Sequence, residues 1–490
     1  MADDIEPVTD RPDEPRIGVD EWVATHDTRS HIGRGPFSRV RRELRRVPTP
    51  SFYLAFAVVA AFLPAITSSD YVVRVGFDTL LYMLLALGLN ITVGYAGLLD
   101  LGYVAFYGFG AYLYAMLASP KFGLHWETLG VIAVVTIATA ILGFLVALPS
   151  RRLLGDYLAI VTLFFGQFFV TVYQNGNQIS VLGFTKHYDV TGGPNGIPDV
   201  DNFDFFGLKI DSVRGYYYTA LIMFSLVLSV VYLIDRSRTG RSWRSLREDP
   251  LAAELMGIPV NRQKLIAFSL GAAIAGMTGT LFAALNTAVF SADFDTPTLI
   301  IVYAILILGG AGSLGGVIIG ALVVNVSLEI LRTSGHATYI FYLAVAIGLI
   351  AFVRPWRWFA AVVGGTIAFG YIVHAVVSSA WPQSDTGAPA IGGPLGSFLD
   401  SWQLYPTHPM KIGNYCFVLL VFVAMGLTLL QGWKRWVALI PTIYLASFVW
   451  ENRLVMEPSI TRLILIGVIL IVLMNMRPQG ILGISRVEIV

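Results

Sequence analysis

The sequence predicts an all-α, polytopic integral membrane protein whose helices are interrupted by glycine-rich breaks. Of its 490 residues, 56% are hydrophobic and only 13% are charged, and the mean hydropathy is +0.68. Such a composition lies outside that of soluble globular domains and is typical of chains with many bilayer-spanning helices. The single Cys416 excludes a framework of intramolecular disulfides, and no Cys/His cluster has zinc-site spacing. We therefore expect neither a metal nor a cofactor bound by this chain.

Apolar segments recur along the whole chain and predict about 13–14 membrane-spanning helices. The stretch from Thr296 to Leu328 contains no charged residue, and we divide it at its glycines. The predicted segments lie near 51–67, 77–93, 103–118, 128–148, 157–173, 216–234, 263–285, 297–309, 316–331, 339–353, 359–380, 413–431, 435–450 and 459–475.

The distribution of Lys and Arg predicts that both termini lie in the cytoplasm. With the N-terminus inside, the inner side holds 24 of the 33 basic residues, including nine before Ser51 and seven from Arg236 to Lys264, and the outer side holds nine. This bias follows the positive-inside rule. We expect a multi-pass protein of the cell membrane, inner or plasma.

Residues 1–46 are predicted to form a disordered cytoplasmic tail that is acidic at first and then basic. Residues 29–46 contain seven arginines directly before the first apolar segment. A secretory signal peptide is not expected there. The basic stretch fixes the topology, and an additional contact with anionic lipid is the alternative.

Two glycine-rich segments repeat the pattern G-x-A-G between apolar runs: Gly94-Tyr95-Ala96-Gly97 and Gly309-Gly310-Ala311-Gly312. Repeated breaks of this kind are typical of transport proteins, because freed backbone groups are tolerated only where protein or water satisfies them. Close packing of helices through glycine is the simpler interpretation.

A carboxylate follows the first of these segments, within an otherwise apolar stretch. Asp100 is expected to face the protein interior or an aqueous cavity, because a charge that faces lipid is costly. We favour a role as the N-terminal cap of a helix that begins at Leu101. A place on a solute path is the alternative.

These segments and several others resemble one family, the LivM-type permeases of branched-chain amino-acid ABC transporters. The matching stretches are "LGLNITVGYAGLLDLGYVAFYGFGAYL", "LLGDYLAIVTLFFGQ", "TGGPNGI", "LREDPLAAELMGIPVNRQKLIAFSLGAAIAGMTGTLFAA", "LILGGAGSLGGVIIGAL" and "MRPQGILG". The resemblance implies an importer subunit that works with a second homologous permease, two ABC ATPase subunits and an external solute-binding protein, with no nucleic acid involved. Importers of urea and short-chain amides use similar permeases, so the resemblance leaves the solute open.

The loop near 241–264 resembles the element that couples such permeases to their ATPases. Ala252, Ala253 and Gly257 keep the A-A-x-x-x-G spacing of the coupling motif, whereas Leu251 stands where the general motif has glutamate. Arg247, Glu248 and Asp249 are expected to form an exposed helix start beside it. A basic loop with an ordinary amphipathic helix is the alternative. The sequence contains no G-x-x-x-x-G-K-[ST] motif, so ATP is expected to bind to partner subunits.

The segment "TGGPNGI" lies in the long outer stretch from about Gln174 to Tyr216 and is predicted to dock the binding protein, with a structural turn as the alternative. The residues proposed for docking are Thr191, Gly192, Gly193 and Asn195.

The sequence departs from the family after residue 353. The family has about ten spanning helices and ends soon after an R-P-x-G sequence, which here stands near the C-terminus. We therefore predict four regions: the tail 1–46, a permease core 47–353, inserted transmembrane segments with an outer loop at 354–458, and a terminal helix with a cytoplasmic tail at 459–490.

The leading hypothesis is therefore an ABC importer permease with helix breaks along its solute path. The residues assigned to the path and its breaks are Asn90, Tyr95, Gly97, Asp100, Tyr103, Gly309 and Gly312. An ion-coupled secondary transporter is the alternative, although the spans hold few ionisable residues for a proton relay. An intramembrane enzyme lacks a cluster of catalytic residues.

Overall fold

A computed structural model describes residues 49–482 of the protein, with short gaps. The gaps are residues 151–154, 178, 181–186, 206, 333, 354–355, 381–386, 388, 390, 392, 431, 459–460, 463, 466, 469 and 472–479. The chain divides into two units at Ala60 and Ala61, and helix α3 (Thr49–Ala61) contains this boundary. The predicted tail 1–46 lies outside the described residues.

The first part of the second unit is a bundle of helices. Successive apolar segments must cross the same thickness in opposite directions, and the closest packing joins helices far apart in the chain, with α12 against both α6 and α7. The elements are α4 (Leu63–Ile66), α5 (Asp70–Leu89), η2 (Asn90–Tyr95), α6 (Tyr103–Leu117), α7 (Thr128–Ser150), α8 (Gly155–Asn175), α9 (Val213–Arg236), α12 (Val260–Asn286), η4 (Ser291–Phe294), α13 (Thr296–Gly309) and α14 (Leu314–Ile330).

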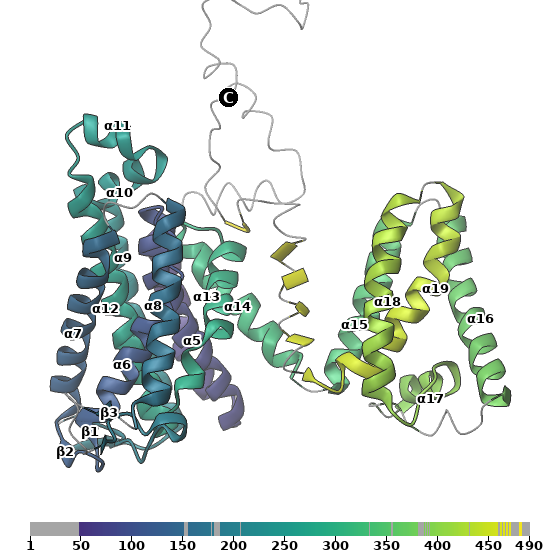
Figure 1. Ribbon diagram of the computed structural model, residues 1–490, viewed down its shortest axis with the longest axis horizontal. Coiled ribbons are helices and arrows are strands. Elements are labelled where there is room, and N and C mark those ends of the chain that lie inside the picture. Colours follow the sequence, from purple (N-terminus) through teal and green to yellow (C-terminus); the bar gives the residue numbers. More distant parts are fainter. Residues whose placement is uncertain are drawn as a thin grey trace, which may run out of the picture. The chain divides into compact units, whose positions relative to one another are not determined.

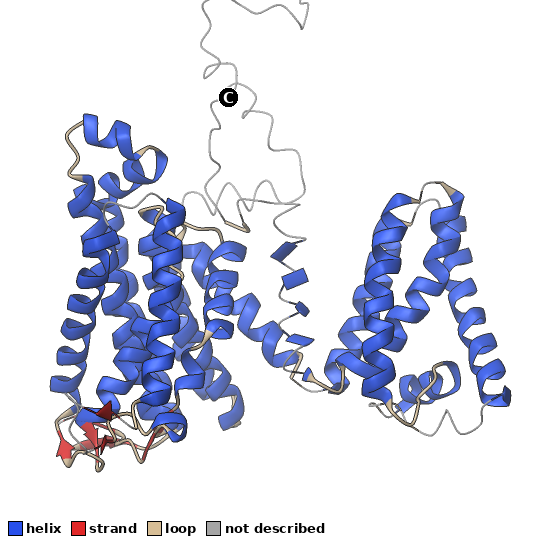
Figure 2. Ribbon diagram, viewed as in Figure 1, coloured by secondary structure: helices blue, strands red, loops and turns tan. Residues whose placement is uncertain are grey.

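The two ends of this bundle differ in structure (Figures 1 and 2). One end carries the two short helices α10 (Arg238–Glu248) and α11 (Pro250–Leu255), and we call it the α10 end. The other end carries the strands, and we call it the strand end. Its strands are β1 (Ala118–Ser119), β2 (Leu124–His125), β3 (Ile179–Ser180), β4 (His187–Tyr188), β5 (Ile197–Pro198), β6 (Phe203–Phe205), β7 (Leu208–Ile210) and β8 (Ala288–Val289), and η3 (Gly193–Asn195) lies among them.

The strands form four antiparallel pairs, three of which are local hairpins: β1 with β2, β3 with β4, and β6 with β7. The fourth pair joins distant parts of the chain, because Ile197 of β5 lies opposite Val289 of β8. The loop that precedes β5 is therefore fixed to the C-terminal end of α12.

Glycines allow α6 and α12 to pack with their backbones in contact. A Cβ atom on Gly110 of α6 would lie 2.2 Å from the carbonyl oxygen of Gly276, and one on Gly279 of α12 would lie 2.3 Å from that of Tyr107. Small residues at such positions are the usual means of close helix packing in membranes, where the hydrophobic effect adds little.

Helices α15 (Ser334–Phe352), α16 (Trp356–Ala380), α17 (Gly393–Trp402), α18 (Pro409–Leu429), α19 (Trp433–Val449) and η6 (Trp450–Leu454) follow the bundle. Trp402 anchors α17, since its indole N–H donates to the Ile367 carbonyl of α16 at 3.1 Å and its ring packs edge-on against Tyr444 of α19. Glu451 and Asn452 are buried in η6, where the Asn452 amide donates to the Leu404 carbonyl at 3.0 Å.

The predicted fold class is confirmed. Among the described residues, eight helices are long and apolar enough to cross a membrane, or up to nine if the bent pair α14 and α15 counts as one span. Helix α6 has only 15 residues because residues 96–102, which the sequence places between two spans, are not helical. The predicted segment 459–475 lies partly outside the described residues.

We predict that Gly110→Ala destabilises the protein by about 1–3 kcal/mol, because the added methyl group would meet the α12 backbone. Thermal unfolding in detergent, followed by tryptophan fluorescence, measures the effect. Gly130→Ala in α7 is the matched control, since nothing lies within 4 Å of its added Cβ. Equal melting temperatures for the two variants would contradict the close approach of α6 and α12.

Candidate functional site: two helix breaks joined beneath α10

The two glycine-rich segments connect α5 to α6 and α13 to α14, and both lie at the α10 end. Helix α5 widens into the π-helix η2 before the first turn, and α13 ends at Gly309 before the second. The side-chain oxygen of Asn90 in η2 accepts a hydrogen bond from the Gly312 backbone N–H at 2.8 Å. Asn90 is fully buried. A side chain of one break therefore satisfies a freed backbone group of the other.

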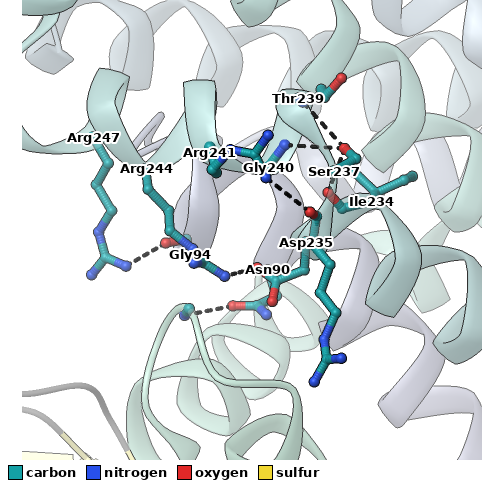
Figure 3. Close-up of polar contacts among 12 residues, drawn as sticks. Asn90, Gly94, Ile234, Asp235, Ser237, Thr239, Gly240, Arg241, Arg244 and Arg247 are labelled. Carbon is teal, nitrogen blue, oxygen red and sulfur yellow. Dashed lines mark hydrogen bonds and ion pairs between the residues drawn. The ribbon is translucent and has the colours of Figure 1, made fainter.

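Arg247, in the last turn of α10, joins the two breaks a second time. Its guanidinium donates to the Gly94 carbonyl in the first break (Figure 3). At 3.4 Å, it also donates to the Ala311 carbonyl in the second break. A charged donor is well suited to carbonyl oxygens that have lost their helical partners, because charge-assisted hydrogen bonds are about twice as strong as neutral ones. Arg247 therefore connects a surface helix to both breaks.

Glycine is required at the breaks for two reasons. Gly97 and Gly312 have φ values of +70° and +88°, a left-handed conformation that other residues rarely adopt. A Cβ on Gly97 would also lie 2.9 Å from Cγ of Arg247, and one on Gly94 would lie 1.9 Å from the Asn90 side-chain oxygen. The G-x-A-G pattern thus leaves room for the side chains that join the breaks.

Asp100 is buried and organises the chain just before α6. One carboxylate oxygen accepts from the Gly102 backbone N–H at 3.1 Å, and no described residue donates to the other. The Asp100 carbonyl accepts from the Tyr303 hydroxyl at 2.6 Å, and the Leu101 N–H donates to the Thr162 hydroxyl at 2.9 Å. The helix begins at Tyr103 rather than at Leu101, so Asp100 closes a turn two residues before the N-cap Gly102.

The residues assigned to a solute path from the sequence are enclosed in this conformation. Tyr95 and Tyr103 have exposed fractions of 3% and 1%. The hydroxyl of Tyr103 lies against α5, since a Cβ on Gly88 would be 2.1 Å from it. Gly309 packs on α14, where a Cβ would lie 2.1 Å from the Gly316 carbonyl oxygen. Their assignment to a path stays a prediction.

The expected helix start at 247–249 differs from the structure. Arg247 and Glu248 end α10, and only Asp249 starts a helix, as the N-cap of α11. Its carboxylate accepts from the backbone N–H groups of Leu251 and Ala252 at 2.8 and 3.1 Å. Arg247 therefore lies in the last turn of α10, where its guanidinium contacts the breaks, and it does not start a helix.

Helix α11 exposes apolar side chains while α10 is anchored. Trp243 of α10 is fully buried, and its indole N–H donates to the Gln263 carbonyl of α12 at 3.1 Å. By contrast, Leu251, Leu255 and Met256 are 74%, 88% and 85% exposed. In the predicted motif, Ala252 is exposed, Ala253 is buried, and Gly257 ends the helix with φ +81° and open space around it.

The predicted docking loop lies at the strand end. Thr191 is buried, and its hydroxyl donates to the Tyr173 carbonyl at 2.7 Å and accepts from the Gly193 N–H at 3.2 Å. Gly192 has φ +76°, and its N–H donates to the Asp189 carboxylate at 2.7 Å. Asn195 is exposed, whereas Thr191 and Gly193 are buried. Thr191 and Gly193 therefore shape the loop, and Asn195 is available for contact.

The sequence reasoning missed the part played here by the C-terminal motif "MRPQGILG". The N–H groups of Ile481 and Leu482 donate to the carbonyls of Leu308 and Gly309, at 2.9 and 3.0 Å. Gly480 packs so closely that a Cβ would lie 2.6 Å from the Gly310 nitrogen. This segment satisfies the last carbonyls of α13, where the second break begins. A glycine after an apolar run is too common a signal to have predicted this contact.

Long apolar helices, two glycine breaks at one end and a surface helix joined to both define a class: polytopic membrane proteins of the transporter type. A family described as "Branched-chain amino acid transport system / permease component" matches residues 71–353. Since this is more than half of the chain, the protein belongs to that family, and it is a multi-pass membrane protein.

Individual relatives agree with the family assignment. The chain is 37% identical over 329 residues to the high-affinity branched-chain amino acid transport system permease protein LivM of Escherichia coli strain K12, covering 62% of this chain and 73% of LivM. It is 24% identical over 263 residues to LivH of Salmonella typhimurium, covering 50% and 80%. It is 30% identical over 146 residues to the fructose import permease protein FrcC of Rhizobium meliloti, covering 29% and 41%. No solved structure matches the chain.

We predict that Asp100→Asn is tolerated whereas Asp100→Leu is not. Asparagine keeps the oxygen that accepts from the Gly102 N–H, and leucine leaves that buried N–H unsatisfied at a cost of about 1–3 kcal/mol. Detergent-solubilised yield and thermal unfolding measure the difference. If Asp100→Asn were as damaging as Asp100→Leu, the charge of Asp100 and not its hydrogen bond would be required.

Proposed function

We propose that the protein is the membrane-spanning permease subunit of an ABC importer for branched-chain or other neutral amino acids. It would work with a second homologous permease, two ATPase subunits that bind ATP, and an external solute-binding protein. The observation that carries this proposal is the double contact of Arg247, because a helix on the surface of the bundle reaches both breaks through one side chain.

Coupling to an ATPase needs a surface that can be gripped and a path from it into the membrane. The exposed Leu251, Leu255 and Met256 offer an apolar surface on α11. Helix α10 is fixed to α12 through Trp243 and to the breaks through Arg247, so a force on α11 would reach both breaks. Exposed apolar side chains at the end of a membrane protein are typical of a protein interface.

The sidedness of the proposal follows from charge. The α10 end holds the basic residues from Arg236 to Lys264, and positive-inside bias puts such an end in the cytoplasm together with both termini. The strand end then faces outward, and the exposed Asn195 in its rigid loop is suited to the binding protein.

Two other functions fit parts of the same description. A permease for urea or short-chain amides would share the family and the coupling element, and an ion-coupled secondary transporter would need neither ATPase nor binding protein. The absence of a phosphate-binding motif in the sequence agrees with an ATP site on partner subunits rather than on this chain.

Reconstitution in proteoliposomes separates these functions. We expect ATP-driven uptake of L-leucine by the complete transporter, and no uptake by this chain alone under an ion gradient. Uptake of urea or acetamide in place of L-leucine would change the solute class. Uptake by the chain alone, driven by an ion gradient, would refute the proposal.

We predict that Arg247→Gln uncouples the transporter. The substitution removes the charged hydrogen bonds from residue 247 to the breaks, which are worth about 1.5–3 kcal/mol. A loss of this free energy corresponds to a decrease in uptake of about 10- to 100-fold. ATP hydrolysis by the assembled complex should continue. The measurement is L-leucine uptake per ATP hydrolysed.

Arg244→Gln is the matched control for this experiment. Arg244 lies one turn earlier on α10, but it pairs with Asp235 and is half exposed. Its loss should leave uptake per ATP within about twofold, as expected for a surface ion pair. Equal effects of the two substitutions would contradict a specific role for the contact between Arg247 and the breaks.

A further inference from the structure

Ionisable side chains are rare in the described spans, and several of them meet at one place. Arg74 and Asp78 lie in the first half of α5, Asp293 lies in η4, and Glu329 lies near the end of α14. Asp78 is the ninth residue of α5, about 12 Å along the helix from its start. Intramembrane charges are costly and commonly mark a pathway for solute or ions.

These four residues line one cavity near the strand end of the bundle, together with Arg462, whose Nε donates to the Pro458 carbonyl at 3.2 Å. Its volume is about 740 Å³, within the range of about 300–1,000 Å³ that is usual for small-molecule sites. Its other walls are partly aromatic, with Tyr82 of α5, Tyr107 of α6 and Phe282 of α12. Tyr107 and Phe282 pack edge to face at 5.6 Å. The cavity thus combines charges of both signs with an apolar surface.

The charged groups are held in place rather than spread over a flexible surface. The Arg74 guanidinium donates to the Asn286 side-chain oxygen at 2.6 Å and lies 3.4 Å from the Asp78 carboxylate. Both side chains of this pair remain more than one third exposed, so a ligand can reach them. Glu329 accepts from the Tyr71 hydroxyl and pairs with Arg332 at 3.2 Å. Asp78 and Asp293 are the two other carboxylates in the cavity wall.

An α-amino acid with an apolar side chain matches these walls. Its carboxylate can accept two hydrogen bonds from the guanidinium of Arg74, a bidentate donor for carboxylates. Its ammonium group can form an ion pair with Asp78 or Asp293. Its aliphatic side chain can pack on the rings of Tyr82, Tyr107 and Phe282. Neutral amides such as urea carry no charge that could pair with Arg74, Asp78 or Asp293. A sugar is also uncharged, so a site for it would not need side chains of opposite charge.

The cavity is also joined to the loop proposed to dock the binding protein. Ala288 and Phe290, which line it, flank Val289 of β8, and Val289 pairs with Ile197 of β5 at the end of that loop. Gly196 has φ +65°, and a Cβ on it would lie 2.1 Å from the Val289 carbonyl oxygen. The loop and one wall of the cavity therefore form one rigid unit, so a protein docked on the loop lies beside the cavity.

We infer that this cavity is a binding site for the zwitterionic head group and side chain of the transported amino acid, with Arg74 for its carboxylate and Asp78 and Asp293 for its ammonium group. The inference rests on the proposed import of amino acids and adds to it the side chains that receive the solute. It also differs from the path predicted from the sequence, because Asn90, Tyr95 and Tyr103 do not line this cavity.

Transport by the complete reconstituted transporter tests the assignment. We expect Arg74→Gln to lower the number of L-leucine molecules moved per ATP hydrolysed by about tenfold or more, and Arg74→Lys to recover part of the loss, because the charge is kept. Arg214→Gln is the matched control, since Arg214 pairs with Asp70 at 3.6 Å at the same end of the bundle but does not line the cavity. If Arg74→Gln and Arg214→Gln moved the same number of L-leucine molecules per ATP hydrolysed, the inference would be overturned.

A labelling experiment tests binding without transport and remains decisive if Arg74→Gln fails to fold. In the complete transporter with Cys416→Ser, Ala292→Cys places a thiol on the cavity wall, and Phe122→Cys places one on the exposed β1–β2 turn. L-leucine should slow maleimide labelling at residue 292 but not at residue 122. 3-Methylbutylamine, which has the same side chain and no carboxylate, should protect neither.

The outcomes separate this inference from the proposed function. If the wild-type transporter shows no ATP-driven uptake of L-leucine, the proposed function itself fails. If the wild type transports L-leucine while labelling at residue 292 is unaffected by it, only the cavity assignment fails, and the cavity is then occupied by lipid or by the partner permease.

Discussion

The structure depends on how backbone groups freed at helix breaks are satisfied inside a membrane. An unsatisfied N–H or carbonyl there costs several kcal/mol, so a break persists only if the protein supplies partners. Here Asn90 supplies an acceptor for the Gly312 N–H, Arg247 supplies donors for the Gly94 and Ala311 carbonyls, and residues 481–482 supply N–H groups for the end of α13. Because each break takes a partner from outside the two helices that it connects, neither can change conformation independently of its neighbours. This shared dependence lets a surface helix influence both breaks at once.

The same constraint explains the division of the bundle into two ends. At the α10 end, basic residues, the exposed apolar side chains of α11 and both breaks lie together. At the strand end, a rigid loop is paired to β8, beside a cavity that contains charges of both signs. The long helices α5 and α12 connect the two ends: α5 carries Arg74 and Asp78 near its start and runs into η2, while α12 carries Gln263 near its start and Asn286 at its end. A movement of the breaks would therefore shift elements that also line the cavity.

Local hydropathy predicted the fold class, because the apolar character of a span is a property of a short segment. It also gave about 13–14 spans, whereas eight or nine of the described helices are long and apolar enough to cross a membrane. The positions of the breaks were also predictable from their glycines. The contact between the breaks was not, since Asn90 and Gly312 are 222 residues apart and an asparagine in an apolar run does not indicate its partner. The start of α6 at Tyr103 rather than Leu101 has a similar cause: the Leu101 N–H bonds to Thr162 on another helix. The cavity was missed because its charges are spread over α5, η4 and α14 and cluster only in the folded protein.

We propose that nucleotide-driven movement of α10 and α11 is passed through Arg247 to both glycine breaks together. Hydrogen–deuterium exchange in the assembled transporter measures this directly, by comparing peptides that contain residues 94–97 and 310–313 with and without bound nucleotide. We expect exchange in the two segments to change in parallel when nucleotide binds, and exchange in peptides from the β1–β2 hairpin to stay constant. Unchanged exchange in both segments during active L-leucine transport would contradict it.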